Sequence, residues 1–164
     1  MNLYRARAGS LVADFLSNMS DRMASSESVV KQLCNLCGRS DDDLQEAAIH
    51  LLEDILRQDA GARLLVHGKS EINRICQLLI SSRDQTQRDA ALALGHIVEG
   101  GDDMAKKAIQ QSNGVRYLCM LLSSRSSPVQ TAALDTTMHL ISGNASNFQQ
   151  MSVPVSYTHL RAHE

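Results

Sequence analysis

A repeat of 42 to 43 residues limits what this chain can fold into more than any other feature of its sequence. Three segments, which begin at Val29, Glu71 and Gly114, align with one another without internal gaps. Residue types recur at Cys34, Cys76 and Cys119, at Gln45, Gln87 and Gln130, and at Ala48, Ala90 and Ala133. Repeats of this length are typical of helical solenoids, in which each unit buries its apolar face against the next.

The apolar residues inside each segment follow the period of an α-helix. In the first segment Ala48, Leu52 and Ile55 recur at i, i+4 and i+7, which places them on one helix face. A polar turn, residues 39–43, precedes this helix, and the equivalent turn of the third segment contains Pro128, which suits the first turn of a helix. Aromatic residues make up only 3% of the chain and Trp is absent. Because strands favour aromatic and β-branched side chains, we predict an all-α fold.

A further, shorter helix is expected before the second and the third segment. The first of these spans residues 62–67 and is ended by Gly68, and the second spans 102–111 and ends near Gly114. Glycine at the end of a helix permits a left-handed cap. Carboxylates at the start of the second, beginning with Asp102, favour the positive end of the helix dipole. Each unit is therefore predicted to consist of a short, a medium and a long helix.

These units resemble armadillo repeats. The resemblance rests on DDMAKKAIQQSNGVRYLCMLL and SSPVQTAALDTTMHLI, which match the family's short helix, glycine-containing turn, leucine-rich helix and V-Q-x-x-A opening of a third helix. The segment DAGARLLVHGKSEINRICQLL repeats the first half of this pattern. The resemblance implies a right-handed α-solenoid of three-helix units. HEAT repeats, with two helices per unit, are the alternative, and the short helix before each glycine turn favours armadillo.

The resemblance covers about residues 28–152 and predicts how the chain is divided. We expect three units followed by the start of a fourth, with the three at about 28–57, 58–99 and 101–142. Residues 1–27 are predicted to form an N-terminal helical segment that holds part of an earlier repeat. Residues 155–164 read VSYTHLRAHE and resemble the translation of a sequencing-library adaptor. We therefore expect 153–164 to be a non-native tail and leave it out of the fold prediction.

Several classes of function are disfavoured by charge and motif content. The formal net charge is −2, and no basic stripe of the kind that binds nucleic acid appears. No apolar run approaches the roughly 18 residues needed to span a bilayer. The sequence has no G-x-S-x-G, phosphate-loop or H-E-x-x-H motif. We therefore expect neither an enzyme nor a membrane protein, and neither a small-molecule substrate nor a cofactor.

The cysteines are predicted to pack in the core. Cys34 and Cys37 have the spacing of half a zinc site, but no second Cys or His pair follows at a suitable distance, so no metal is expected. Three of the four cysteines recur at one repeat position, as core packing would produce. Reduced cysteines indicate the cytoplasm or the nucleus.

The resemblance implies a protein or peptide partner held along a concave ladder formed by the long third helices. The predicted ladder residues are Glu46, His50, Glu53, Asp54, Arg57, Arg88, Leu92, His96, Thr131, Asp135 and His139. The first unit of this ladder is mostly acidic, so a partner with a basic segment is expected. The plainer interpretation is that these polar residues only solvate the helix surface.

In peptide-binding armadillo proteins of the importin-alpha type, an Asn near the end of the third helix and a Trp one turn earlier hold the ligand. The Asn positions here hold Asp54, His96 and His139. The Trp positions hold His50, Leu92 and Asp135. Recognition of nuclear-import signals by that mechanism is therefore not expected. The function predicted is a non-catalytic scaffold. The alternatives are the targeting arm of a larger ligase or kinase, and a cofactor of a chaperone or small GTPase.

Overall fold

The computed structural model of the chain describes residues 10, 13–14, 26–99 and 102–142. Every regular element that it describes as a named segment is a helix. In chain order these are α2 (Ser26–Cys37), α3 (Asp42–Gln58), α4 (Ala60–Arg63), α5 (Lys69–Leu78), α6 (Asp84–Glu99), α7 (Asp103–Gln111), α8 (Gly114–Leu121) and α9 (Ser127–Ile141). Most of the predicted N-terminal segment, the start of a fourth unit and the predicted tail lie outside the described residues.

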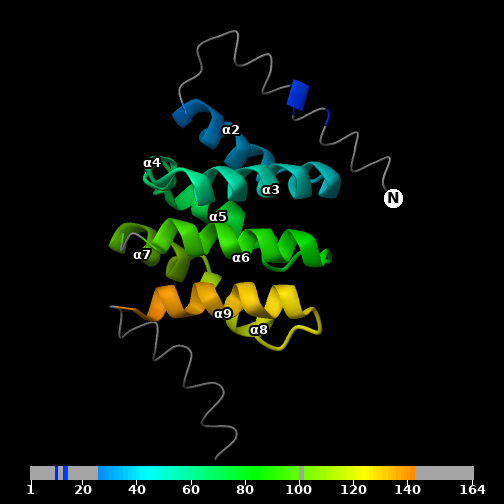
Figure 1. The fold of residues 1–164 in the computed structure, drawn as a ribbon, viewed down its shortest axis with the longest axis vertical. Helices are drawn as coiled ribbons and strands as arrows, with labels where there is room; N and C mark the ends of the chain where they lie inside the picture. Colours follow the sequence, from blue (N-terminus) through cyan, green and yellow to red (C-terminus); the bar gives the residue numbers. More distant parts are fainter. Residues whose placement is uncertain (1–9, 11–12, 15–25, 100–101, 143–164) are drawn as a thin grey trace, which may run out of the picture.

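The long helices α3, α6 and α9 lie side by side in one layer, as Figure 1 shows. A second layer holds α2, α5 and α8, each packed against the long helix that follows it in the chain. The core lies between the two layers. Its largest fully buried side chains are Leu33, Ile49, Leu52, Leu56, Ile72, Ile75, Leu79, Leu94, Ile109, Leu118 and Leu140. The arrangement is that of an α-solenoid, in which each unit packs against its neighbours along the stack.

Aspartates begin several of the helices. Asp41 precedes α3 and accepts hydrogen bonds from the backbone N–H groups of Asp43 and Leu44. Asp102 accepts one from the N–H of Met104 and so caps α7, as the sequence predicts. These side chains satisfy N–H groups that the first helical turn leaves without a partner.

The first short helix starts and ends earlier than predicted. Helix α4 spans Ala60–Arg63 rather than residues 62–67, because Asp59 supplies the N-cap by accepting a hydrogen bond from the N–H of Gly61. Gly68 does not end α4 in a left-handed conformation. Its φ of −68° and ψ of 135° are extended, and it stands at the N-cap of α5.

The turn between α7 and α8 also differs from the prediction. Asn113, with φ of 60°, takes the left-handed conformation that was expected of glycine. Asparagine tolerates this region better than most residues. Gly114 instead begins α8 and is buried. A Cβ atom added to Gly114 would lie 2.9 Å from Sγ of Cys76 on α5. The same Cβ would lie 2.5 Å from Cγ2 of Ile109 on α7, so a residue without a side chain is required both in the α7–α8 turn and at the contact with α5.

The aligned glutamines have one structural role in all three units. Each donates a side-chain amide hydrogen bond to a backbone carbonyl that lies one to three residues after the end of the preceding medium helix. The donor and acceptor residues are Gln45 and Arg39, Gln87 and Ser81 at 2.8 Å, and Gln130 and Leu122 at 2.8 Å. The glutamine therefore closes the turn between the medium and the long helix of each unit.

The aligned cysteines lie on the medium helices, in the packing position that the sequence predicts. Cys34 and Cys76 are fully buried, and Cys76 faces Gly114 of the following unit. Cys119 is only half-buried, on the last medium helix of the described part. All four cysteines are free thiols. Burial raises the pKa of Cys34 and of Cys76 to about 12, and it also raises the pKa of Cys37.

We expect alkylation of the folded protein by iodoacetamide to modify Cys119 well before the other cysteines. The thiolate is the reactive form, so buried thiols with a raised pKa react slowly near neutral pH. Burial also raises the pKa of Cys119, so its rate should increase with pH. Peptide mapping by mass spectrometry would give the order of modification. Equal rates at Cys119 and Cys76 in the folded protein would contradict this account of the packing.

Within the part of the chain that the structure describes, no helix is long and apolar enough to cross a membrane. The same residues contain no group of three or more His, Cys, Asp or Glu side chains placed to hold a metal ion.

Candidate functional site

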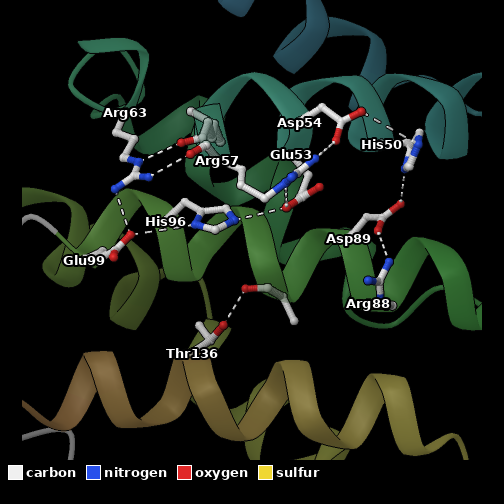
Figure 2. A network of polar contacts seen from close by, with 12 residues as sticks. His50, Glu53, Asp54, Arg57, Arg63, Arg88, Asp89, His96, Glu99 and Thr136 are labelled. Atoms are coloured by element: carbon white, nitrogen blue, oxygen red, sulfur yellow. Dashed lines mark hydrogen bonds and ion pairs between the residues drawn. The ribbon is translucent and has the colours of Figure 1, made fainter. Parts of the chain in front are cut away.

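The predicted ladder lies on the three long helices. Its first five residues are on α3, the next three on α6 and the last three on α9. The two halves of the ladder differ in what their side chains contact. Between α3 and α6 the polar side chains bond to one another, as Figure 2 shows. Between α6 and α9 the ladder positions are largely open.

Asp89 on α6 anchors one end of the α3–α6 junction. Its side chain is fully buried, and its carboxylate lies 3.0 Å from Nδ1 of His50 on α3. It also accepts hydrogen bonds from Gln85 at 3.0 Å and from Arg88 at 3.2 Å. A buried carboxylate without such partners would be strongly destabilising. His50 therefore helps to hold α3 against α6, whereas Gln85 and Arg88 satisfy the buried carboxylate from its own helix.

Glu53 occupies the centre of the same junction. Although it was predicted to face a ligand, it is only 5% exposed. Its Oε1 atom lies 3.0 Å from Nε2 of His96 on α6 and 3.5 Å from Nε of Arg57 on its own helix. The Glu53 and His96 side chains are thus largely used in contacts between two units, and little of Glu53 remains for a partner.

Arg63, on the short helix α4, closes the other end of the junction. It donates hydrogen bonds to the backbone carbonyls of Leu56 at 2.6 Å and Arg57 at 3.1 Å, at the end of α3. Its NH1 group also contacts Glu99, the last residue of α6, at 2.7 Å. Nδ1 of His96 lies 3.8 Å from the same Glu99 carboxylate. One arginine therefore joins three helices across the boundary of two units.

Most of the acidic side chains of α3 are already paired with arginines. Asp43 and Glu46 contact Arg83 at 2.6 Å and 3.3 Å, and the hydrogen bond that Arg83 donates to Asp43 raises the pKa of that guanidinium. Asp54 is paired with Arg57, whose pKa it raises in the same way. The acidic charge that suggested a basic ligand at this end of the ladder is therefore balanced in large part within the protein.

The α6–α9 junction is held by small and apolar residues instead. The buried hydroxyl of Thr136 donates a hydrogen bond to the backbone carbonyl of Ala91 at 2.5 Å. A Cβ atom added to Gly95 would lie 2.8 Å from the same hydroxyl oxygen, so the two helices approach closely there. Among the described residues, no ion pair joins α6 to α9, whereas the pairs His50–Asp89 and His96–Glu53 join α3 to α6.

Four ladder positions of the α6–α9 half remain accessible. Leu92 is half-buried, and Thr131, Asp135 and His139 are exposed. In the described part of the chain, these side chains form no hydrogen bond or ion pair that ties them to another helix. We call Leu92, Thr131, Asp135 and His139 the open ladder.

The His50–Asp89 pair has the geometry of a histidine oriented by a buried carboxylate, which occurs in hydrolytic sites. In such a site the second ring nitrogen meets a nucleophile. Here Nε2 of His50 lies 3.9 Å from a carboxylate oxygen of Asp54 instead. The pair is therefore arranged as a contact between helices and not as an activated nucleophile.

The prediction missed Asp89, although the sequence contains a signal for it. Asp89 stands where the other two units have alanine, Ala47 and Ala132. A charge at a position that is apolar in the equivalent units requires a special partner. Arg63 and Glu99 were also missed. Their pairing depends on where a short helix ends relative to a long one, and no spacing in the sequence specifies this.

The chain is similar in sequence and in fold to repeat proteins. Residues 102–137, which contain α7, α8 and most of α9, match the model of the armadillo/beta-catenin-like repeat. No curated protein matches the chain.

Three engineered proteins, with crystal structures from the Northeast Structural Genomics Consortium, are similar to it at TM-scores of 0.69, 0.68 and 0.66 and identities of 27%, 28% and 27%. The matches cover 83%, 78% and 79% of this chain, and 57%, 33% and 51% of the engineered proteins. The chain thus spans a little over half the length of the first of them. Together with the short, medium and long helices described above, these similarities show that the described residues form an α-solenoid and that residues 102–137 form an armadillo-type repeat.

Proposed function

We propose that this solenoid is a non-catalytic scaffold that binds an extended segment of a partner protein across α6 and α9. Armadillo-type repeats and the engineered repeat proteins support a role in protein interaction in general. The observation that carries the more specific proposal is the contrast between the two ladder halves. The α3–α6 half is occupied by its own hydrogen bonds and ion pairs (Figure 2). The open ladder instead presents accessible side chains on adjacent helices.

The chemistry of the open ladder suggests what the segment contains. Leu92 offers an apolar contact on α6, and Asp135 offers an exposed carboxylate on α9. A segment with an apolar side chain and, next to it, a basic side chain would use both. We thus still propose a partner with a basic segment, as the acidic residues of α3 had suggested. In this proposal the basic side chain contacts Asp135 instead of Glu53 and Asp54. The cytoplasm or the nucleus stays our prediction for the location.

Selection from a phage-displayed library of random peptides, followed by fluorescence titration of the selected peptides, tests this proposal. We expect the substitutions Asp135→Lys and His139→Glu to weaken binding of the selected peptides at least tenfold, because both alter exposed side chains of the open ladder. Tenfold corresponds to about 1.4 kcal/mol of binding free energy. Glu53 is unsuitable for this test, since its removal would also disturb the α3–α6 junction.

Lys107→Glu is the matched control, because Lys107 is an exposed residue of the short helix α7. It should leave binding unchanged, and a thermal melt of each variant would show that the fold is retained. The proposal fails if the selected peptides bind the Asp135→Lys protein as tightly as the parent protein, or if they lose binding to the Lys107→Glu protein instead.

A further inference from the structure

The first residue of each long helix is acidic in two units and a serine in the third. Asp42 begins α3 and Asp84 begins α6, whereas Ser127 begins α9. The three positions are equivalent in the repeat alignment, and all three residues are exposed. A carboxylate at this position interacts favourably with the positive end of the helix dipole. The third unit therefore lacks a negative charge that the first two units carry at the same place.

The start of α9 differs from that of α3 in its other charges as well. Asp41 caps α3 with its side chain, and the first turn of α3 contains further carboxylates. In α9 the N-cap residue Ser126 makes no side-chain capping hydrogen bond, and the first turn contains no acidic residue. The exposed Arg125 stands just before it, where the other units have Ser40 and Ser82. At this point the third unit has thus lost negative charge and gained positive charge.

Ser127 is followed directly by Pro128, which distinguishes it from the other serines and threonines of the chain. The chain has two prolines, and only Pro128 follows a serine or a threonine. Protein kinases of the proline-directed class select this pair, because proline brings no backbone N–H into a pocket that offers no acceptor for one. Both residues are exposed, next to a turn. The first N–H groups of a helix have no intrahelical partner, so opening this end for a kinase breaks few hydrogen bonds.

We propose that Ser127 is a phosphorylation site of a proline-directed protein kinase, and that its phosphate supplies the charge that Asp42 and Asp84 supply in the other units. In the transfer from ATP, a bond forms between Oγ of Ser127 and the γ-phosphorus, and the bond from that phosphorus to the β,γ-bridging oxygen breaks. ADP leaves, and the hydroxyl proton passes through the kinase to solvent. The phosphate carries a charge of about −1.5 to −2 near neutral pH, and it lies beside the first N–H groups of α9 and close in sequence to Arg125.

Incubation of the 164-residue chain with a proline-directed kinase and MgATP, followed by peptide mapping by mass spectrometry, tests the site. We expect one phosphate, on Ser127. Ser127→Ala and Pro128→Ala should each lower the incorporation at least tenfold. Ser123→Ala is the matched control, since it alters an exposed serine of the preceding turn, and it should leave the incorporation unchanged. No phosphate on Ser127, or equal incorporation into the Pro128→Ala protein, would overturn the proposal.

Thermal denaturation tests whether the phosphate replaces the missing carboxylate. The midpoint of the phosphorylated protein should be about 1–4 °C higher, because negative charge at its first turn stabilises α9. A phosphatase should reverse this shift, and about 1 M NaCl should reduce it. Ser127→Asp should also raise the midpoint, whereas the control Ser123→Asp should not. An unchanged or lower midpoint after phosphorylation would contradict the equivalence with Asp42 and Asp84.

Phosphorylation also acts on the partner site, a consequence that rests on the proposed function. Ser127 precedes Thr131 by four residues and Asp135 by eight, so the three side chains lie on one face of α9. The phosphate therefore extends the negative charge of the open ladder. We expect selected peptides with a basic residue to bind the phosphorylated protein roughly threefold more tightly, as measured by fluorescence titration.

The failure of this consequence differs from the failure of the proposed function. If Asp135→Lys weakens binding to the unphosphorylated protein but the phosphate leaves the affinity unchanged, the proposed function stands and the effect of Ser127 on the partner site is wrong. If Asp135→Lys has no effect, the open ladder is not the partner site. In either case the kinase and denaturation experiments decide whether Ser127 is modified and what its phosphate does to α9.

Discussion

Leu94→Ala is expected to lower the free energy of unfolding by about 2–5 kcal/mol, the usual cost of truncating a fully buried leucine. Leu94 is fully buried on α6, and α6 is packed between α3 on one side and α9 on the other. Neighbouring helices on both sides limit how far the structure can collapse into the cavity, which favours the upper part of the range. Urea denaturation followed by circular dichroism would measure the change.

Leu64→Ala provides the comparison, because Leu64 is largely exposed beside α4. It should change the free energy of unfolding by less than about 0.5 kcal/mol. If the two variants unfolded at the same urea concentration, the α6 core would not be packed as described. A change in the slope of the transition would instead indicate that the units had begun to unfold separately.

Gly114→Ala should be the next most damaging of the single substitutions considered, at about 1–3 kcal/mol, because it overpacks the α7–α8 turn and its contact with α5 of the preceding unit. The new Cβ would lie 2.5 Å from Cγ2 of Ile109 and 2.9 Å from both the Ile109 carbonyl oxygen and Sγ of Cys76. A backbone carbonyl cannot rotate away as a flexible side chain can. The α7–α8 turn would have to move, and its contact with α5 would loosen. Thermal denaturation would record this as a lower midpoint.

Gly38→Ala separates this effect from the general effect of replacing glycine. At Gly38 the added Cβ would meet only the side chain of Arg74, at 3.0 Å, and that side chain is flexible. Replacing glycine by alanine reduces the entropy of the unfolded chain, so Gly38→Ala should be close to neutral or slightly stabilising. Equal losses of stability in the two variants would show that the position of Gly114 between units has no special importance.

Much of the fold could be predicted because the same pattern of helices and turns occurs in three aligned segments of the sequence. The helical spacing of Ala48, Leu52 and Ile55 identified a long helix. The polar turn at 39–43 and the carboxylates that begin at Asp102 indicated where two helices begin. The errors are local. Asp59 competes with the expected start of α4, and Asn113 takes the conformation assigned to its glycine neighbour. Which of two neighbouring residues caps a helix, or takes the left-handed conformation, depends on the local hydrogen bonds of the backbone N–H groups. The spacing of apolar residues does not determine it.

The ladder could be placed on the right helices, but its internal bonding could not. Whether Glu53 faces solvent or His96 depends on the rotation and the register of two helices 43 residues apart in sequence. A shift of one residue would separate the two side chains. The repeat alignment identifies the residues that occupy equivalent positions in different units. It does not identify the residues of one unit that contact residues of the next. Asp89 is the exception, since its departure from the alanine of the other units is a signal present in the sequence, although the prediction did not use it.

The glutamine bond in each turn has a consequence for how such a chain can change over time. The amide donates to a backbone carbonyl, and every residue type supplies one. The acceptors here are arginine, serine and leucine, so the residue that supplies the carbonyl is free to vary while the donor is kept. A substitution that alters the charge or size of a side chain in the turn between the medium and the long helix therefore leaves the glutamine hydrogen bond in place. The side chains of these turns can thus change in charge or size while the packing of the helices that the turns connect is retained.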